Sequence, residues 1–488
     1  MSLFSEKLKL YIEISSQTIY QLSKKAEVNR TVIHKTLSGE RVPGDDFLEK
    51  LYGALMLSPE EKRELRRLAE RARVGEKVYR RREGVRKLIL SLSYRPILNT
   101  AFAFNTNINE MKRPAEKKEM QILNSREAVI QQVINLLSEA FSSEEKPEIC
   151  MYLPFSEKEI YEAVYHFYMS VEKEILLKNL IAIEKDYKED AACLRNLESL
   201  SYVLNFALND REGYEPYYFY TGEMQKKADS IAMPYFLLAD NIMMTFDTTI
   251  HSAFVYYEKE TVNYFKEKIV RLFEASEPFV KRLDTVLEMY GLASGRINEL
   301  IIEPLPCMGK YMTDERIESL VKKECPMREE AIKMASDFYS TLRAKDCWPV
   351  SFFSFEAIEI FMKNGIMPTL PQDIVRPMTK EERDAIINEI IRDSALEKEP
   401  FIAINSHKLK TPVNVEVIKT SKDEIVFRRF NDAGNEQKTL FLCEASMVDA
   451  FLDFMKMLCS SEYVYSKNEM IKKMQEYVKG GEAKDVTV

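Results

Sequence analysis

The segment TIYQLSKKAEVNRTVIHKTLSGERVP, residues 18–43, holds two short helical patterns separated by only three residues. Thr18 is followed three residues later by Gln21, the spacing of a capping box, so we expect a helix to begin at Ile19 and to end by Lys25. Two helices this short cannot lie antiparallel across so tight a turn. The segment therefore predicts two helices that cross at a steep angle.

The second helix has its own start and stop residues. Asn29 is a favourable N-cap residue, and Gly39 stands where a left-handed C-cap residue belongs. The turn between the helices consists of residues 26–28. We expect the two helices to share a small core made of Leu22, Val28, Ile33 and Leu37.

This packing leaves polar side chains on the outer face of the second helix, beside its positive N-terminus. They are Arg30, Thr31, His34 and Lys35. Arginine and lysine reach guanine edges in the major groove, and backbone amides and hydroxyl groups bind phosphates. We therefore expect these four residues to contact bases, and a second group to hold phosphates, namely Thr18, Asn29 and Arg41.

The segment resembles the helix-turn-helix of the Cro and lambda-repressor type, also called the xenobiotic-response-element family of regulators. The features that carry the resemblance are Thr18, Leu22, VNRTVI and GERVP. The following GDDFLEKLYGALMLSPEEKRELRRLAE continues the match as a fourth and a fifth helix, the latter started by Ser58, Pro59 and Glu61. The resemblance covers about residues 5–70 and implies an all-α, five-helix DNA-binding head.

The chain departs from the family pattern at two positions. The family often has Gly in the turn where this chain has Glu27, and often has Gln at the start of the first of the two helices where this chain has Ile19. A left-handed conformation at Glu27 costs on the order of 1 kcal/mol, which five capped helices can absorb. The missing Gln removes one expected contact, so affinity or sequence preference should differ from the family's norm.

Charge is distributed unevenly along the chain. The 488 residues have a net charge of -8, yet residues 1–95 carry 21 Lys/Arg against 13 Asp/Glu, a net of +8. The other 393 residues therefore carry -16. A polyanion such as nucleic acid would meet the basic end and be repelled by the acidic bulk.

A basic segment follows the head. From about Glu76 it has helical spacing, with one apolar stripe composed of Val78, Val85, Leu88 and Leu92. Extra phosphate contact, a dimer seam and an ordinary solvated linker face are all compatible with it. The polar, irregular residues 105–120 predict an exposed hinge. The expected organisation is a head (1–70), a basic connecting helix and hinge (71–120) and a body (121–488) that could divide into two lobes near 300.

Helical and strand patterns alternate in the body. Residues 148–184 show strand, helix and strand in that order, which favours an α/β unit, and Asp240 and Asn241 predict a tight hairpin. Near the end, four runs predict successive antiparallel strands: PFIAINS, VNVEVIKT, EIVFRRFN and KTLFLCE. The fold class expected is multidomain, an all-α head followed by a large α/β (α+β) body with mixed or antiparallel strands.

The sequence contains no recognisable catalytic constellation. Neither G-x-G-x-x-G nor G-x-x-x-x-G-K-[ST] occurs, and no G-x-S-x-G is present. The four histidines and seven cysteines lack metal-site spacing. We therefore expect no metal, no cofactor and no enzymatic activity. Cys307 is a conceivable nucleophile, but nothing local would lower its pKa, so a packed thiol is favoured.

Three aromatic clusters are candidates for lining a ligand pocket. The residues concerned are Tyr217, Tyr218, Tyr220, Tyr235, Trp348 and Phe352. Core packing is the commoner use of aromatic residues at strand spacing, and a homodimer interface is a further alternative.

These patterns predict a sequence-specific DNA-binding transcriptional regulator. A single head is too small to be selective, so we expect a homodimer on two DNA half-sites, with a body that oligomerises and is a candidate sensor of a small molecule. No apolar run approaches the roughly 20 residues of a membrane span, and the start lacks a secretion signal, so we expect the cytoplasm. The alternatives are an enzyme or defence-type effector whose head only recruits it or regulates its own gene, and a protein-binding adaptor.

Overall fold

A computed structural model of the protein describes eleven stretches of the chain: 2–93, 119–142, 146–170, 173–185, 190–209, 211–221, 233–283, 298–344, 348–396, 401–430 and 437–479. The chain divides into two compact units, Met1–Gly84 and Val85–Val488. The first unit thus extends past residue 70, the predicted end of the head. Residues 105–118, most of the predicted hinge, lie outside the described stretches.

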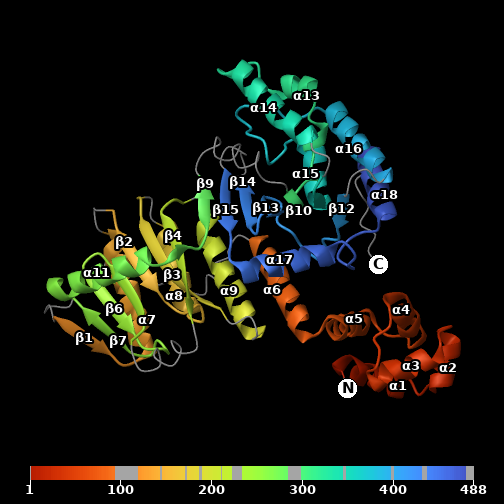
Figure 1. Ribbon diagram of the computed structural model, residues 1–488, viewed down its shortest axis with the longest axis horizontal. Helices are drawn as coiled ribbons and strands as arrows, with labels where there is room; N and C mark the ends of the chain where they lie inside the picture. The colour runs from red at the N-terminus through yellow and green to blue at the C-terminus, as the bar shows by residue number, and fades with distance from the viewer. Residues whose placement is uncertain are drawn as a thin grey trace. The chain divides into compact units, whose positions relative to one another are not determined.

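The described residues of the first unit form helices joined by short turns. Its helices are α1 (Leu3–Ile14), α2 (Ile19–Lys25), α3 (Arg30–Ser38), α4 (Asp45–Ala54), α5 (Pro59–Val74) and the first half of α6 (Glu76–Leu92) (Figure 1). The predicted cap of α5 is confirmed, because Ser58 and Glu61 form a capping box with Pro59 in the first turn. The core of the unit includes Phe4, Leu8, Leu22, Ile33, Leu51 and Tyr52.

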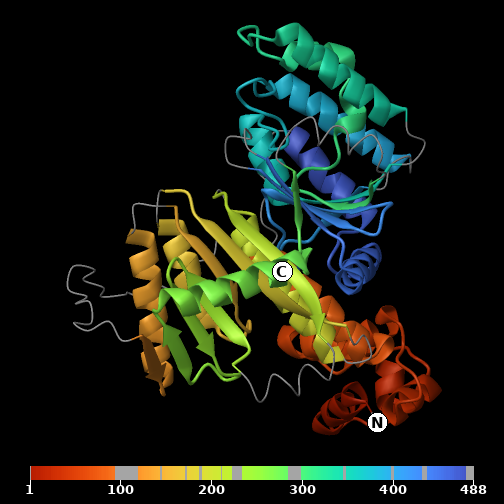
Figure 2. The same cartoon turned by 60° about the vertical axis from the view of Figure 1, so that its left-hand side comes forward.

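The second unit contains two mixed sheets, which Figure 2 shows in orange to green and largely in blue. The first sheet has the order β1-β7-β6-β5-β2-β3-β4-β8. Its strands are β1 (Met120–Leu123), β2 (Glu148–Tyr152), β3 (Leu176–Glu184), β4 (Tyr214–Thr221), β5 (Tyr235–Ala239), β6 (Ile242–Phe246), β7 (Ala253–Tyr256) and β8 (Glu277–Pro278).

The second sheet has the order β12-β11-β10-β13-β14-β15-β9. Its strands are β9 (Lys281–Leu283), β10 (Asn298–Ile302), β11 (Val350–Ser354), β12 (Phe401–Ile404), β13 (Val415–Thr420), β14 (Ile425–Phe430) and β15 (Gln437–Leu442). The chain leaves the first sheet at β8 and enters the second at β9, before the position near 300 where a division into lobes was expected.

The two sheets share one topology. In the first, β2, β3 and β4 are parallel neighbours, and β5, β6 and β7 follow antiparallel on the other side of β2. In the second, β10, β11 and β12 are parallel, and β13, β14 and β15 follow antiparallel on the other side of β10. An early edge strand closes each sheet by pairing antiparallel with the last strand, β1 with β7 and β9 with β15. Apart from β8, which pairs antiparallel with β4 and has no counterpart among the described strands of the second sheet, the second half of the body therefore repeats the topology of the first.

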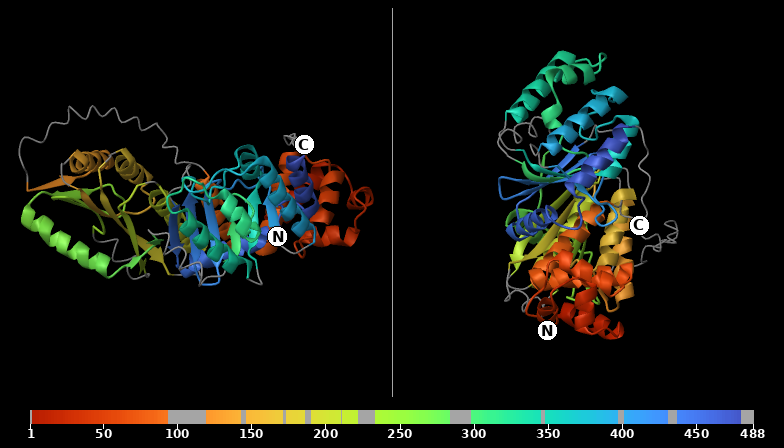
Figure 3. Two further views of the ribbon diagram at one scale, coloured as in Figure 1. Left: turned by 90° about the horizontal axis from the view of Figure 1, so that it is seen from above. Right: turned by 90° about the vertical axis from the view of Figure 1, so that its right-hand side faces the viewer.

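Helices cover both faces of the first sheet. They are α7 (Arg126–Ser142), α8 (Lys158–Ser170) and α9 (Asp190–Ala207) on one face and α11 (Lys259–Glu274) on the other. The left view in Figure 3 shows α7 in orange and α11 in light green on opposite sides of this sheet. Phe273 of α11 packs with Tyr152 and Leu180, while Ile149 and Ile181 face the helices of the other side.

The second sheet is covered in the same way. One face packs on α17 (Ala445–Leu458), and the other on a group composed of η2 (Gly309–Tyr311), α13 (Asp314–Leu320), α14 (Arg328–Arg343), α15 (Phe355–Asn364), α16 (Lys380–Ala395) and α18 (Lys467–Val478). None of the helices in the described stretches is long and apolar enough to cross a bilayer.

The two halves of the body share a core. Helices α9 and α17 are in contact between the sheets (Figure 1), and residues of both sheets belong to one apolar cluster. Side chains of the second sheet also hold the loop between α9 and β4, since Arg429 donates to the carbonyl of Leu208, and Lys438 donates to the carbonyl of Arg211 at 2.9 Å. The second half of α6 joins this core through Val85 and Leu88, as its predicted stripe requires.

Several predictions for the body are confirmed and one is wrong. Residues 148–184 form β2, α8 and β3, and Asp240 occupies the left-handed turn of the β5–β6 hairpin at φ 48°. PFIAINS, however, is not antiparallel to its successor. It contains β12, which is parallel to β11, while β13 pairs with β10. The true neighbours were missed because residues 298–302 and 350–354 were not recognised as strands.

Candidate nucleic-acid interface

Local hydrogen bonds fix the start of α2. The amide of Gln21 donates to the Thr18 hydroxyl at 3.2 Å, and the amide of Thr18 donates to Gln21 Oε1 at 2.9 Å. The predicted capping box and the predicted bounds, Ile19–Lys25, are therefore confirmed.

The turn and the ends of α3 also follow the prediction. Asn29 Oδ1 accepts from the amide of Thr31 at 2.8 Å, and Gly39 caps the other end at φ 83°. Glu27 has φ 53°, so this acidic residue occupies the left-handed position that often belongs to glycine. The next amide, that of Val28, donates to the carbonyl of Ser23 at 3.0 Å, which closes the end of α2.

One side of α3 is anchored in the core of the first unit. Leu22 and Ile33 are fully buried, and Val28 and Leu37 are half-buried against the same cluster. The predicted small core is thus present. Because this side of α3 is occupied, the other side carries its polar residues outward.

All seven residues predicted to contact DNA are exposed, and they lie together on the α2–α3 unit: Thr18, Asn29, Arg30, Thr31, His34, Lys35 and Arg41. Two of them are in contact, since Arg30 Nε donates to His34 Nε2 at 3.4 Å. The Thr18 hydroxyl donates to Gln21 Oε1 at 3.0 Å, so a phosphate contact by this hydroxyl requires it to rotate.

The cations on this face lack acidic partners. Some basic side chains elsewhere in the first unit are paired, such as Arg66 with Glu49 at 2.6 Å and Arg73 with Asp45 at 2.7 Å, whereas others, such as Arg63, form no ion pair with a described carboxylate. Arg30, Lys35 and Arg41 likewise form no ion pair with any described carboxylate. Residues 18–43 contain five cationic and two acidic side chains. The positive charge of this face is therefore available to an external anion.

The sequence interpretation missed part of this face. Tyr20 on α2 is 56% exposed, and Lys24 Nζ lies 5.7 Å from the centre of its ring. Lys24 and Lys25 are both exposed in the last turn of α2. Tyr20 and Lys24 lie opposite Leu22 on the helix, and this spacing was the signal that could have identified them.

The six aromatic residues expected to line a pocket are dispersed. Tyr217 contacts Phe273 of α11 at 5.2 Å between ring centres, whereas its neighbour Tyr218 contacts Phe279 at 5.6 Å on the opposite face of the sheet. This separation follows from the alternation of side chains along a strand. Phe352 is fully buried in the second sheet.

The remaining three aromatic residues have separate surroundings. Tyr220 donates to Glu444 Oε1 at 3.3 Å, Tyr235 contacts Tyr152 edge to face, and the half-buried Trp348 precedes β11. The structure therefore distributes the six residues over both faces of one sheet and over a second sheet, and does not gather them around one cavity.

A buried polar cluster lies in the second sheet. Ser351 donates to Glu303 Oε1 at 2.5 Å, and Arg428 pairs with Glu416 at 3.2 Å. Burial, and then the charge of Glu416, raise the pKa of Glu303 well above its usual range. The amide of Cys307, the conceivable nucleophile, donates to Ser351 Oγ at 3.1 Å. The cluster places a carboxyl with a raised pKa in the interior of the body.

Comparisons with known proteins add little. No protein-family model and no curated protein matches the chain. Among solved structures, TrmBL2, an archaeal chromatin protein whose structure shows a novel mode of DNA binding, is 16% identical over 57% of this chain and 94% of its own, with a TM-score of 0.23. Phosphatidylserine synthase of Haemophilus influenzae Rd KW20 is 10% identical over 74% of this chain and 92% of its own, with a TM-score of 0.24. These TM-scores are too low for either likeness to bear on function.

Proposed function

We propose that the protein is a sequence-specific DNA-binding transcriptional regulator whose first unit places α3 in the major groove. One observation carries this proposal: α3 is anchored by one side, and its exposed side presents cations without acidic partners next to the helix N-terminus. The resemblance of residues 5–70 to the Cro and lambda-repressor type of helix-turn-helix supports it.

The residues of α3 divide into two roles. Arg30, Lys35, His34 and Thr31 contact base edges, where a bidentate guanidinium is suited to guanine. Asn29 and Arg41 bind phosphates together with the amides at the start of α3, and Lys24 and Lys25 extend this contact along α2. The Arg30–His34 hydrogen bond is weak at 3.4 Å, so a base can replace it.

The regulator acts as a homodimer in this proposal. One head presents a single recognition helix, and selectivity among genomic sites requires two half-sites spaced by about one helical turn, roughly 34 Å. In this proposal the body, which has an acidic net charge, mediates oligomerisation and binds a small effector.

The experiment first recovers bound fragments from a pool of genomic DNA and then compares variants on the recovered site and on random DNA. Arg30→Ala should weaken binding to the recovered site by about 5- to 150-fold, and binding to random DNA much less. Arg63→Ala, which removes an exposed arginine from α5, is the matched control and should retain both affinities.

Two results would count against the proposal. Equal losses on both DNAs would refute a base-contacting role for Arg30. Failure of the wild-type protein to be retained on DNA at physiological salt would refute the function and favour a protein-binding adaptor.

A further inference from the structure

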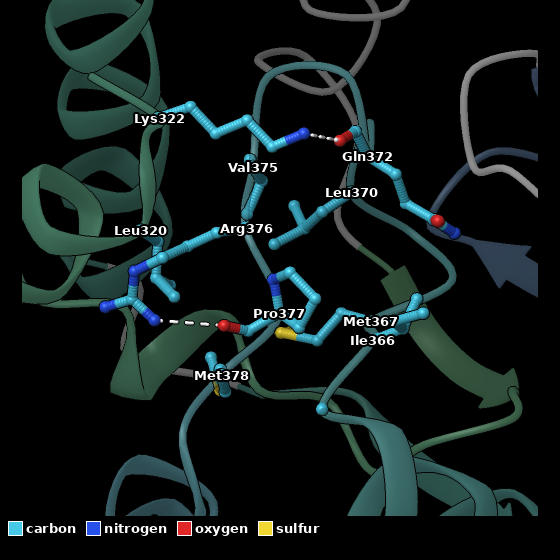
Figure 4. Close-up of a pocket in the computed structure, with 11 residues that line it drawn as sticks. Leu320, Lys322, Ile366, Met367, Leu370, Gln372, Val375, Arg376, Pro377 and Met378 are labelled. Atoms are coloured by element: carbon cyan, nitrogen blue, oxygen red, sulfur yellow. Dashed lines mark hydrogen bonds between the residues drawn. The ribbon is translucent and has the colours of Figure 1, made fainter. Parts of the chain in front are cut away.

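A cavity of about 220 Å³ lies in the second half of the body (Figure 4). Its walls come from residues 320–322, at the end of α13 and directly after it, and from residues 365–378, which join α15 to α16. None of the aromatic clusters singled out in the sequence contributes to it.

Backbone hydrogen bonds hold the two walls together. The amide of Arg376 donates to the carbonyl of Leu320 at 3.0 Å, and the amide of Lys322 donates to the carbonyl of Ile374 at 2.9 Å. These bonds form a short antiparallel bridge between segments that lie far apart in the sequence. The cavity is consequently formed before any ligand arrives, which favours binding.

Gly365 fixes the base of the cavity. It ends α15 in the left-handed conformation at φ 73°, and its carbonyl accepts from the amide of Met378 at 2.9 Å. A Cβ at this position would lie 2.3 Å from the carbonyl oxygen of Met378. Only glycine lets the loop return this closely to the end of α15.

The lining of the cavity is mainly apolar. Ile366, Met367, Leu370 and Val375 are all half-buried, and Met367 and Leu370 point into the space in Figure 4. Apolar side chains that remain partly uncovered around a preformed cavity indicate a site for a hydrocarbon group.

Two cations line the same cavity, and they differ in how they are bound. The guanidinium of Arg376 is held by Glu382 at 2.7 Å and lowers the pKa of that carboxyl to about 2. Lys322 Nζ makes a single hydrogen bond among the described residues, to the carbonyl of Gln372 at 2.6 Å. An ammonium group has three donors, so Lys322 keeps donors for an anion at the rim of the cavity.

We propose that this cavity binds a small apolar monocarboxylate, with the hydrocarbon among Met367, Leu370 and Val375 and the carboxylate on Lys322. A dry cavity of about 150 Å³ holds benzene, so the larger volume here suits a chain or ring of about six to eight carbons. The proposal goes beyond DNA binding and does not depend on it.

The test uses the full-length protein without DNA and three probes of equal length: hexanoate, hexan-1-ol and hexylammonium. Calorimetric titration should find hexanoate bound most tightly and hexylammonium least. Lys322→Met should weaken hexanoate binding by about 10-fold or more, the range of a charge-assisted hydrogen bond, and leave hexan-1-ol unchanged. Lys323→Met, which removes an exposed neighbouring charge, is the matched control.

A second variant tests the location. Leu370→Trp fills the cavity from an already half-exposed position and should abolish binding of hexanoate and hexan-1-ol alike. The proposal is overturned if hexanoate does not bind at millimolar concentration, if Lys322→Met and Lys323→Met behave alike, or if Leu370→Trp leaves hexanoate binding intact. Retention on DNA is measured separately, so failure here leaves the proposed function standing.

Discussion

At the scale of single residues, the body contains a carboxyl whose ionisation opposes folding. Glu303 is 7% exposed, and burial together with Glu416 raises its pKa. The unfolded chain releases this proton near pH 4.3, whereas the native protein still holds it above that pH. Stability should therefore fall as the pH rises from this value through the folded pKa.

Glu303→Gln should remove that pH dependence. The melting temperature of the variant minus that of the wild type should be larger at pH 8 than at pH 5, because the amide needs no proton to stay neutral. Thermal melting at the two pH values checks this, with Glu324→Gln, an exposed glutamate, as control. An identical difference from wild type at both pH values would show that Glu303 does not hold a proton in the native state.

At the scale of elements, the α2–α3 turn stores strain in one residue. Glu27 is exposed and left-handed, a conformation that costs a residue with a Cβ about 1–2 kcal/mol. Glycine avoids this cost, but it also raises the conformational entropy of the unfolded chain, which offsets part of the stabilisation. Glu27→Gly should therefore stabilise the first unit by about 0.5–1 kcal/mol. Hydrogen exchange at the amide of Ile33 measures the effect. Glu27→Ala removes the charge but keeps the Cβ, and an equal gain there would assign the effect to charge instead.

The ends of the helices could be predicted because their causes are local. Thr18 and Gln21, or Ser58 and Glu61, bind backbone groups within one turn of themselves. The site face of α3 was predictable for the same reason, since helical spacing alone separates Ile33 from its exposed neighbours.

Elements defined by distant partners were not predictable in this way. The strand NELII and the strand VSFFS are parallel neighbours inside a sheet, so they lack the alternation that identifies a half-exposed strand. The cavity near Lys322 depends on backbone bonds between segments more than 50 residues apart in the chain. No local sequence pattern predicts such a contact.

At the scale of the whole molecule, a repeated topology underlies the body. Apart from β8 at the edge of the first sheet, each half has three parallel strands, three antiparallel strands and an edge strand that precedes them in the chain. The sequence contains no short period, and the repeat is apparent only from strand order. The basic first unit and the acidic remainder differ in charge, which fits the proposal that the first unit binds an anionic polymer.

The most direct test of the account measures the affinity of the full-length protein for its recovered DNA site between about 50 and 200 mM salt. Affinity should fall steeply, and Arg41→Ala should weaken binding to all sequences alike and reduce the slope of log affinity against log salt by about one. Arg63→Ala should leave the slope unchanged. An affinity that does not respond to salt, or an Arg41→Ala slope equal to that of the wild type, would contradict the claim that the exposed cations beside α3 bind DNA.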